Sequence, residues 1–186
     1  MTFEFFPIDG LCLITPQRHS DDRGFFMESY NQKAFNAAMG DDISFVQDNF
    51  SLSKTKGTVR GLHYQSPPFG QGKLVRCTKG SIIDVAVDAR KNSPTYGQHI
   101  KVILSAENVK QLWVPEGFLH GFATLEDNTE VAYKVTNYYD QKSDGCVQWN
   151  DPDLAIDWGL DEASAILSEK DKSAPRFKSF ISPFHS

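Results

Sequence analysis

Residues 58–65 read TVRGLHYQ, a run of β-branched and aromatic residues around one glycine that is typical of a β-strand. Successive side chains of a regular strand point to opposite faces, so Arg60 and His63 would face different ways unless a bulge at Gly61 re-aims the chain. A histidine beside a guanidinium group would be a base next to an anion site. From this octapeptide alone, a surface arginine and a histidine satisfied in the core are the simpler interpretation.

Short runs of the same kind recur along the chain. Roughly eight or more runs alternate between apolar and polar residues and are separated by Gly- and Pro-containing turns, whereas only residues 31–39 show good helical spacing, with Gly40 as a stop. This pattern predicts an all-β fold, a barrel or jelly roll with a few short helices. No βαβ rhythm or glycine-rich dinucleotide motif occurs, which argues against a nicotinamide enzyme.

Two of these runs, residues 73–78 and 81–88, are joined by the pair Lys79–Gly80. Such a pair predicts a tight turn, so we expect the two runs to form a β-hairpin. In the second run, Asp84 and Asp88 alternate with valines, which predicts one polar and one apolar side.

Length and composition limit the possible functions. The 186 residues predict a single domain spanning 1–186, and 40% hydrophobic with 23% charged residues is an ordinary soluble composition. A net charge of −5 without a basic run argues against nucleic-acid binding. No apolar run reaches the ~20 residues of a membrane span, and the first residues do not form a basic signal-peptide start. Cys12, Cys77 and Cys146 are odd in number and far apart, which favours buried thiols and a cytoplasmic location.

Polar side chains on the predicted strands are candidates for ligand binding. Gln47 and Asn49 share one face of the run 44–51, and their amides could bind a heterocyclic base or a sugar, although a polar strand face is the commoner case. Arg23 and Glu28 flank an aromatic run and would ordinarily be solvated charges. Tyr133 lies in the run 129–136, where a buried hydroxyl needs a partner or a function.

A second motif, PEGFLHGF at residues 115–122, places His120 among aromatic residues. Its Pro-x-Gly-x-x-His spacing resembles the second motif of cupins. Metal-binding cupins carry His-x-His in their first motif, whereas here His63 is followed by Tyr64 and Gln65. His63, His120 and Asp84 could in principle share an ion, but divalent metals usually need three or more protein ligands in defined geometry. We therefore expect a cupin without metal.

Seven motifs in unbroken order between residues 8 and 175 together carry a specific resemblance. They are DRGFF (22–26), VQDN (46–49), RGLHYQ (60–65), GKLVR (72–76), DVAVD (84–88), PEGFLHGF (115–122) and WNDP (149–152). In this order they resemble the dTDP-4-dehydrorhamnose 3,5-epimerase family. The resemblance implies a cytoplasmic homodimer of cupin jelly rolls that needs no cofactor. It also implies epimerisation at C3 and C5 of dTDP-4-dehydro-6-deoxy-D-glucose to dTDP-4-dehydro-L-rhamnose, in dTDP-L-rhamnose biosynthesis.

The same resemblance implies roles for individual residues. His63 would be the base, Asp171 its partner and Tyr133 the proton donor, while Tyr139 would stack on the thymine ring. Lys73 is a plausible stabiliser of the enolate, since it begins a strand after a Pro- and Gly-containing loop. Further family contacts with the substrate map onto Arg23, Glu28, Gln47, Asn49, Arg60, His120 and Lys170. Of these, Arg23 and Glu28 are expected to reach the site of the neighbouring subunit.

These residue types suit proton transfer next to a ketone. An epimerase needs a base on one face of the sugar, an acid on the other, and a donor or cation at the ketone oxygen. Histidine has an ordinary pKa of about 6.5, and a carboxylate on its second nitrogen stabilises the imidazolium. Arg60, Arg23 and Lys170 could oppose the diphosphate. A mono-epimerase, a ketoisomerase and a non-catalytic sugar-nucleotide-binding cupin remain as alternatives.

Overall fold

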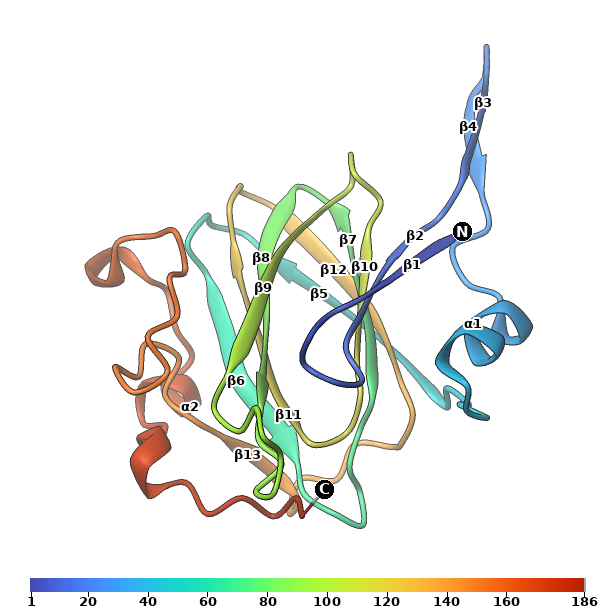
Figure 1. Ribbon diagram of the computed structural model, residues 1–186. Coiled ribbons are helices and arrows are strands. Elements are labelled where there is room, and N and C mark those ends of the chain that lie inside the picture. Colours follow the sequence, from blue (N-terminus) through green and yellow to red (C-terminus); the bar gives the residue numbers. More distant parts are fainter. Residues whose placement is uncertain (186) are drawn as a thin grey trace.

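The computed structural model describes residues 1–185 and is built on two facing antiparallel sheets (Figure 1). In spatial order the first sheet contains β1 (Thr2–Phe5), β2 (Cys12–Thr15), β10 (Gln111–Val114), β7 (Lys73–Lys79), β12 (Thr129–Val135) and β5 (Gln47–Ser53). The second contains β13 (Asp144–Cys146), β6 (Val59–Gln65), β11 (Phe118–Thr124), β8 (Ser81–Asp88) and β9 (His99–Ser105). The predicted all-β class and jelly-roll architecture are confirmed.

The predicted hairpin of the seventh and eighth strands is wrong. β7 pairs with β10 and β12, whereas β8 pairs with β9 and β11, so the two strands belong to different sheets. Gly80 has a φ of +74°, and the turn at this residue carries the chain from one sheet to the other. Two-residue turns join paired strands and also form corners between sheets, and the sequence does not distinguish these uses.

Strand β8 is buried on both sides, which also corrects the expected polar face. Ile82 and Ala86 belong to the core between the sheets, whereas Val85 and Val87 belong to a second core on the outer face. The carboxylate of Asp84 is fully buried in this strand. The outer core exists because the chain after β13 folds back over the five-stranded sheet and buries Trp149, Trp158 and Phe184.

This C-terminal segment contains three short helical turns, namely η1 (Glu162–Ser164), α2 (Glu169–Lys172) and η2 (Phe177–Ser179). Figure 1 shows them in orange and red beside β6. The side chain of Ser168 caps α2 by accepting a hydrogen bond from the Asp171 amide. The C-terminal segment thereby places α2 against the strand that carries the RGLHYQ motif.

Two elements lie outside the sheets. Helix α1 (Gln32–Met39) begins after Asn31, whose side chain accepts a bond from Ala34, and ends at Gly40 in the left-handed conformation, as predicted. The hairpin of β3 (Arg18–Asp21) and β4 (Gly24–Met27) extends away from both sheets (Figure 1). None of the helices in residues 1–185 has the length and apolar character needed to cross a membrane.

Candidate active site

A bulge in β6 brings Arg60 and His63 to the same cavity. On β11, Phe122 pairs with Arg60 and His120 pairs with His63, so one residue of β11 opposes two residues of β6. The extra residue reverses the alternation of side chains beyond Gly61. The structure therefore realises the bulged alternative that the sequence left open.

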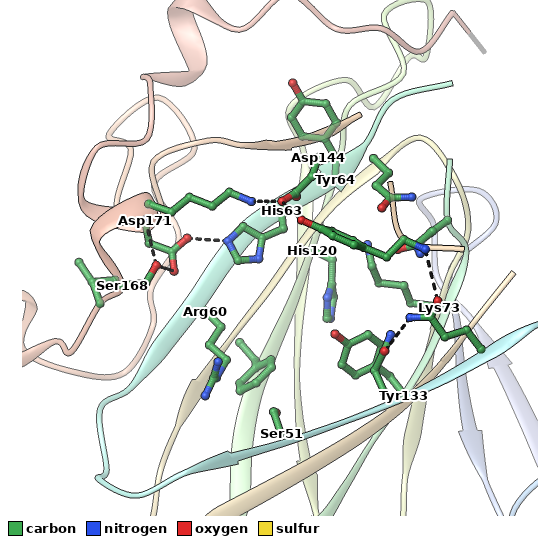
Figure 2. Close-up of a pocket in the computed structure, with 18 of the residues that line it drawn as sticks. Ser51, Arg60, His63, Tyr64, Lys73, His120, Tyr133, Asp144, Ser168 and Asp171 are labelled. Atoms are coloured by element: carbon green, nitrogen blue, oxygen red, sulfur yellow. Dashed lines mark hydrogen bonds and ion pairs between the residues drawn. The ribbon is translucent and has the colours of Figure 1, made fainter. Parts of the chain in front are cut away.

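The cavity is lined by residues of both sheets and has a volume of about 520 Å³ (Figure 2). Ten of the twelve predicted site residues line it: His63, Tyr133, Asp171, Lys73, Gln47, Asn49, Arg60, His120, Tyr139 and Lys170. They come from β5, β6, β7, β11, β12, the loop after β12 and the C-terminal segment, so both sheets and the tail contribute. Residues that are far apart in the chain thus form one polar interior.

Arg23 and Glu28 do not line this cavity. Arg23 is at the tip of the β3–β4 hairpin, where its guanidinium group is exposed and pairs with Asp21 at 2.5 Å. Glu28 directly follows β4 and is exposed. The structure of the single chain therefore separates both residues from the ten that it brings together.

His63 and Asp171 form a dyad on the cavity wall. The distance from His63 Nε2 to Asp171 Oδ1 is 2.5 Å, and the Ser168 hydroxyl donates to the second carboxylate oxygen at 2.8 Å. Burial acts to raise the pKa of Asp171, but the hydrogen bonds from His63 and Ser168 outweigh it and hold the pKa below its usual value. Asp171 is therefore an ionised acceptor that leaves Nδ1 of His63 as the free ring nitrogen.

The opposite wall supplies Lys73 and Tyr133. Lys73 is almost completely buried at the start of β7, and burial lowers its pKa to about 8 against the opposing effect of the Asp144 and Asp84 carboxylates. Burial likewise raises the pKa of Tyr133, so its phenol keeps its proton over the physiological range. A proton donor and a cation thus enter the cavity from the sheet that faces His63.

A second histidine–carboxylate pair lies deeper in the wall. His120 Nε2 is 2.9 Å from Asp84 Oδ1, and both side chains are buried. Asp84 is on β8 and does not line the cavity, whereas His120 on β11 does. Figure 2 shows the His120 ring between the His63 wall and Tyr133.

The rim of the cavity is held by amide and carboxylate groups. Lys170 pairs with Asp144 at 2.5 Å, and the Tyr139 hydroxyl donates to the same carboxylate oxygen at 3.2 Å. The Tyr139 amide donates to Gln47 Oε1 at 3.3 Å, and Gln47 Nε2 donates to Asn49 at 2.8 Å. The predicted amide pair therefore anchors the backbone of Tyr139, whose ring is exposed at the rim.

Sequence reasoning missed several lining residues, among them Asp144 and Ser168. Asp144 begins β13, which has only three residues and no alternating pattern. Ser168 stands three residues before Asp171, a spacing typical of a helix cap, and that signal could have identified it. Within residues 1–185, no group of three or more His, Cys, Asp or Glu side chains converges so as to bind a metal ion.

Comparison with known proteins shows the family to which this chain belongs. A model of the dTDP-4-dehydrorhamnose 3,5-epimerase family matches residues 6–179. This chain belongs to that family. It is 51% identical to the dTDP-4-dehydrorhamnose 3,5-epimerase of Salmonella typhimurium over 168 residues, or 90% of this chain and 91% of the relative. It is equally similar to the Pseudomonas aeruginosa epimerase, at 51% over 170 residues, which cover 91% and 92% of the two chains.

A solved structure of the epimerase family agrees in shape as well as in sequence. The Legionella pneumophila 3,5-epimerase, solved with dTDP-4-keto-L-rhamnose, superimposes with a TM-score of 0.92 at 47% identity. The alignment covers 97% of this chain and 94% of the Legionella chain. The family model spans residues 6–179, so every residue that lines the cavity lies within the matched part of the chain.

Proposed function

We propose that this cavity inverts C3 and C5 of dTDP-4-dehydro-6-deoxy-D-glucose to give dTDP-4-dehydro-L-rhamnose, with His63 as the base. One observation carries the proposal, namely that His63 and Tyr133 enter the cavity from opposite sheets. Inversion of a carbon requires a proton to leave one face and return to the other, so a base and an acid on facing walls suit the reaction. Membership of the 3,5-epimerase family supports the same reaction.

His63 acts on the carbons that flank the ketone. With Nε2–H donated to Asp171, its Nδ1 lone pair takes the proton from C3 or C5, and the C–H electron pair moves into the enolate. Asp171 stabilises the imidazolium that forms. The Tyr133 phenol then delivers a proton to the opposite face of the same carbon, and the ketone is restored.

The enolate carries negative charge on the C4 oxygen, and Lys73 supplies a cation near it. Removing an ammonium group from water is costly, but in the dry interior it interacts more strongly with a developing anion than it would in solvent. The carboxylates of Asp84 and Asp144 favour the charged form of Lys73. We propose that Lys73 in its ammonium form stabilises the enolate.

The nucleotide lies at the rim in this proposal. Tyr139 stacks on the thymine, because its ring is exposed where the cavity opens. Arg60 and Lys170 face the diphosphate with charge-assisted hydrogen bonds. Gln47, Asn49 and His120 bind polar groups of the substrate from within the cavity.

We further propose that the protein is a homodimer in which the β3–β4 hairpin delivers Arg23 and Glu28 to the partner's cavity. The hairpin extends away from its own sheets and exposes Phe25 and Phe26. Strand β5 is an edge strand that exposes Phe50 on its outer face. A second copy would cover these apolar side chains.

All three cysteines are free, which supports a reducing, cytoplasmic location.

Deuterium exchange tests the reaction directly. Chelator-treated protein is incubated in D₂O with dTDP-4-dehydro-6-deoxy-D-glucose, and deuterium at C3 and C5 is followed by NMR. We expect exchange at both carbons, its loss in His63→Ala, and its retention in His185→Ala, a control that changes an exposed histidine outside the cavity. Exchange at one carbon would show a mono-epimerase or ketoisomerase, and nucleotide binding without any exchange would show a binding protein.

A further inference from the structure

His120 is the direct cross-strand partner of His63, and each histidine has its own carboxylate. His63 on β6 pairs with His120 on β11 in the ladder of the five-stranded sheet, so both rings stand on the same inner face. Asp171 reaches His63 from the C-terminal segment, whereas Asp84 reaches His120 from β8 on the far side of β11. The mechanism above assigns the first pair, whereas it gives Asp84 only an electrostatic effect on Lys73 and no role for its contact with His120.

Asp84 is an unusual residue for a protein core. It is completely buried, and its neighbours on the same face, Ile82 and Ala86, are apolar core residues. One oxygen, Oδ1, contacts His120, and the other, Oδ2, is buried with no hydrogen-bond partner within residues 1–185. A buried carboxylate with one unpaired oxygen is costly, so its presence in this core calls for an explanation.

The contact with Asp84 fixes the direction of the His120 ring. Nε2 is taken by Asp84, which lies behind the cavity wall, and Nδ1 has no protein partner in the part of the chain that the structure describes. Nδ1 has no partner but is not fully buried, and His120 lines the cavity, so this nitrogen is accessible from the cavity. The carboxylate therefore holds the histidine with one nitrogen facing the substrate space.

The charge of Asp84 decides what that nitrogen can do. A carboxylate in an apolar core is stabilised by a countercharge, and the His120 ring, whose Nε2 lies 2.9 Å away, supplies one when it is protonated. An imidazolium carries a proton on Nδ1 as well as on Nε2, so it presents a hydrogen-bond donor to the cavity. A donor held in a dry site suits an oxygen that becomes anionic during the reaction.

We propose that Asp84 is a positioning residue that keeps His120 protonated and aimed at the C4 oxygen, where His120 hydrogen-bonds the enolate. The inference rests on the proposed epimerase reaction and adds a second donor beside Lys73. No bond to carbon forms or breaks in this step, and His120 keeps its proton throughout. Because C3 and C5 both flank C4, the same oxygen becomes anionic whichever proton His63 removes.

The Asp84→Asn variant is the first test, because asparagine keeps the size of the side chain and an oxygen acceptor but removes the charge. A matched control is Asp88→Asn, which changes another fully buried carboxylate on the same strand, held by Arg90, Ser93 and Thr95 outside the cavity. We expect Asp84→Asn to lower kcat by roughly 10- to 100-fold with KM changed less than about threefold. The Asp88→Asn control should keep kcat within about twofold even where it lowers Tm.

Two further readouts separate a role at the C4 oxygen from a merely structural role. Deuterium exchange at C3 and C5 should slow by the same factor in Asp84→Asn, since one enolate oxygen serves both carbons. In the free protein, the ¹⁵N signals of His120, assigned with His120→Gln, should report an imidazolium at neutral pH and a neutral ring in Asp84→Asn. The double variant Asp84→Asn/His120→Gln should be no slower than His120→Gln alone, because the carboxylate acts through the histidine.

The outcomes that overturn the inference are distinct from those that overturn the reaction. An unchanged kcat or an unchanged ¹⁵N state of His120 in Asp84→Asn, with normal exchange in the wild type, would remove the role of Asp84 and leave the epimerase intact. Slowing at only one carbon would move His120 from the C4 oxygen to another group of the sugar. Absence of exchange in the wild type would overturn the proposed reaction and this role with it.

Discussion

Gly61 lies directly against Gly121, and a Cβ atom added to Gly61 would be 2.6 Å from the Gly121 Cα atom. The φ of Gly61 is +132°, a region that other residues rarely adopt. Both conditions hold at the bulge that turns Arg60 and His63 into the same cavity. The geometry of the site therefore depends on a close approach of two backbones that carry no side chains.

Replacing Gly61 with alanine should lower the free energy of unfolding by about 3 kcal/mol, because backbone strain and overpacking add at this position. Urea denaturation measures the change. Gly24→Ala is the matched control, since Gly24 has a similar φ of +128° but open space where a Cβ would stand. The control should lose only about 1 kcal/mol. Equal losses in both variants would show that the approach to Gly121 is not limiting.

Loss of the Asp171 charge should disable His63. We expect Asp171→Asn to lower kcat by about 100-fold, because the neutral amide no longer stabilises the imidazolium or fixes its tautomer. Ser168→Ala, which removes one bond to the carboxylate but keeps its charge, should lower kcat only about threefold. In steady-state kinetics, the double variant with His63→Ala should match His63→Ala alone. A further drop in the double variant would mean that the two residues act independently.

Burial of Lys73 should cost stability at neutral pH. Its pKa falls from 10.5 to about 8 in the folded state, so the unfolded chain binds more protons between these values and stability rises with pH across that window. Below pH 8 both states are protonated and the full cost, about 3 kcal/mol, is present. Lys73→Met should therefore stabilise the protein by about 1–3 kcal/mol at pH 7, with the gain shrinking towards pH 10.

Urea denaturation at pH 7 and pH 10 measures this effect of Lys73. Lys79→Met, at the exposed end of the same strand, is the control and should show no such pH dependence. The Lys73→Met variant should also lose activity, since the cation at the enolate is gone. A variant that is less stable than the wild type at pH 7 would contradict the assigned cost of burial.

The hairpin can be tested by mixing two inactive variants. If Arg23 serves the partner's cavity, Arg23→Ala and His63→Ala homodimers should both be impaired. Their heterodimer contains one cavity with both defects and one with neither. Random assembly on co-expression should restore about a quarter of the wild-type activity, since half the dimers are mixed and each has one intact site. Activity that stays at the level of the separate variants would place Arg23 outside the partner's cavity.

Most of the residues of the candidate site could be predicted from the sequence, whereas the strand pairing that brings them together could be predicted only in part. Local signals sufficed for α1, because Asn31 and Gly40 act within a few residues of the helix they limit. The sheet to which β7 and β8 each belong is set by their pairing with distant strands, β10 for β7 and β11 for β8. The turn at Gly80 between them does not determine that pairing. Long-range pairing also explains why β13 was missed, since its three residues are a strand only beside β6.

The burial of both faces of β8, the strand of Asp84, shows a second feature that the sequence alone did not predict. Alternation with valine predicted a polar side for β8, because a charged residue is usually exposed. The opposing strands and the tail bury both sides, and the groups that favour a carboxylate there, His120 and Lys73, are neighbours in space and not in the chain. Arg23 and Glu28 were identified through the family resemblance, and the single chain leaves both outside its cavity.

The dyad of His63 and Asp171 joins positions that are 108 residues apart, with strands β7 to β13 between them in the chain. During synthesis, the strands that form the cavity leave the ribosome well before α2 does. A nascent or clipped chain without α2 would therefore contain Arg60, Lys73 and His63 but lack the carboxylate that His63 contacts. In the proposed mechanism, turnover begins only when the tail has docked, so activity would report that α2 has reached its place beside β6.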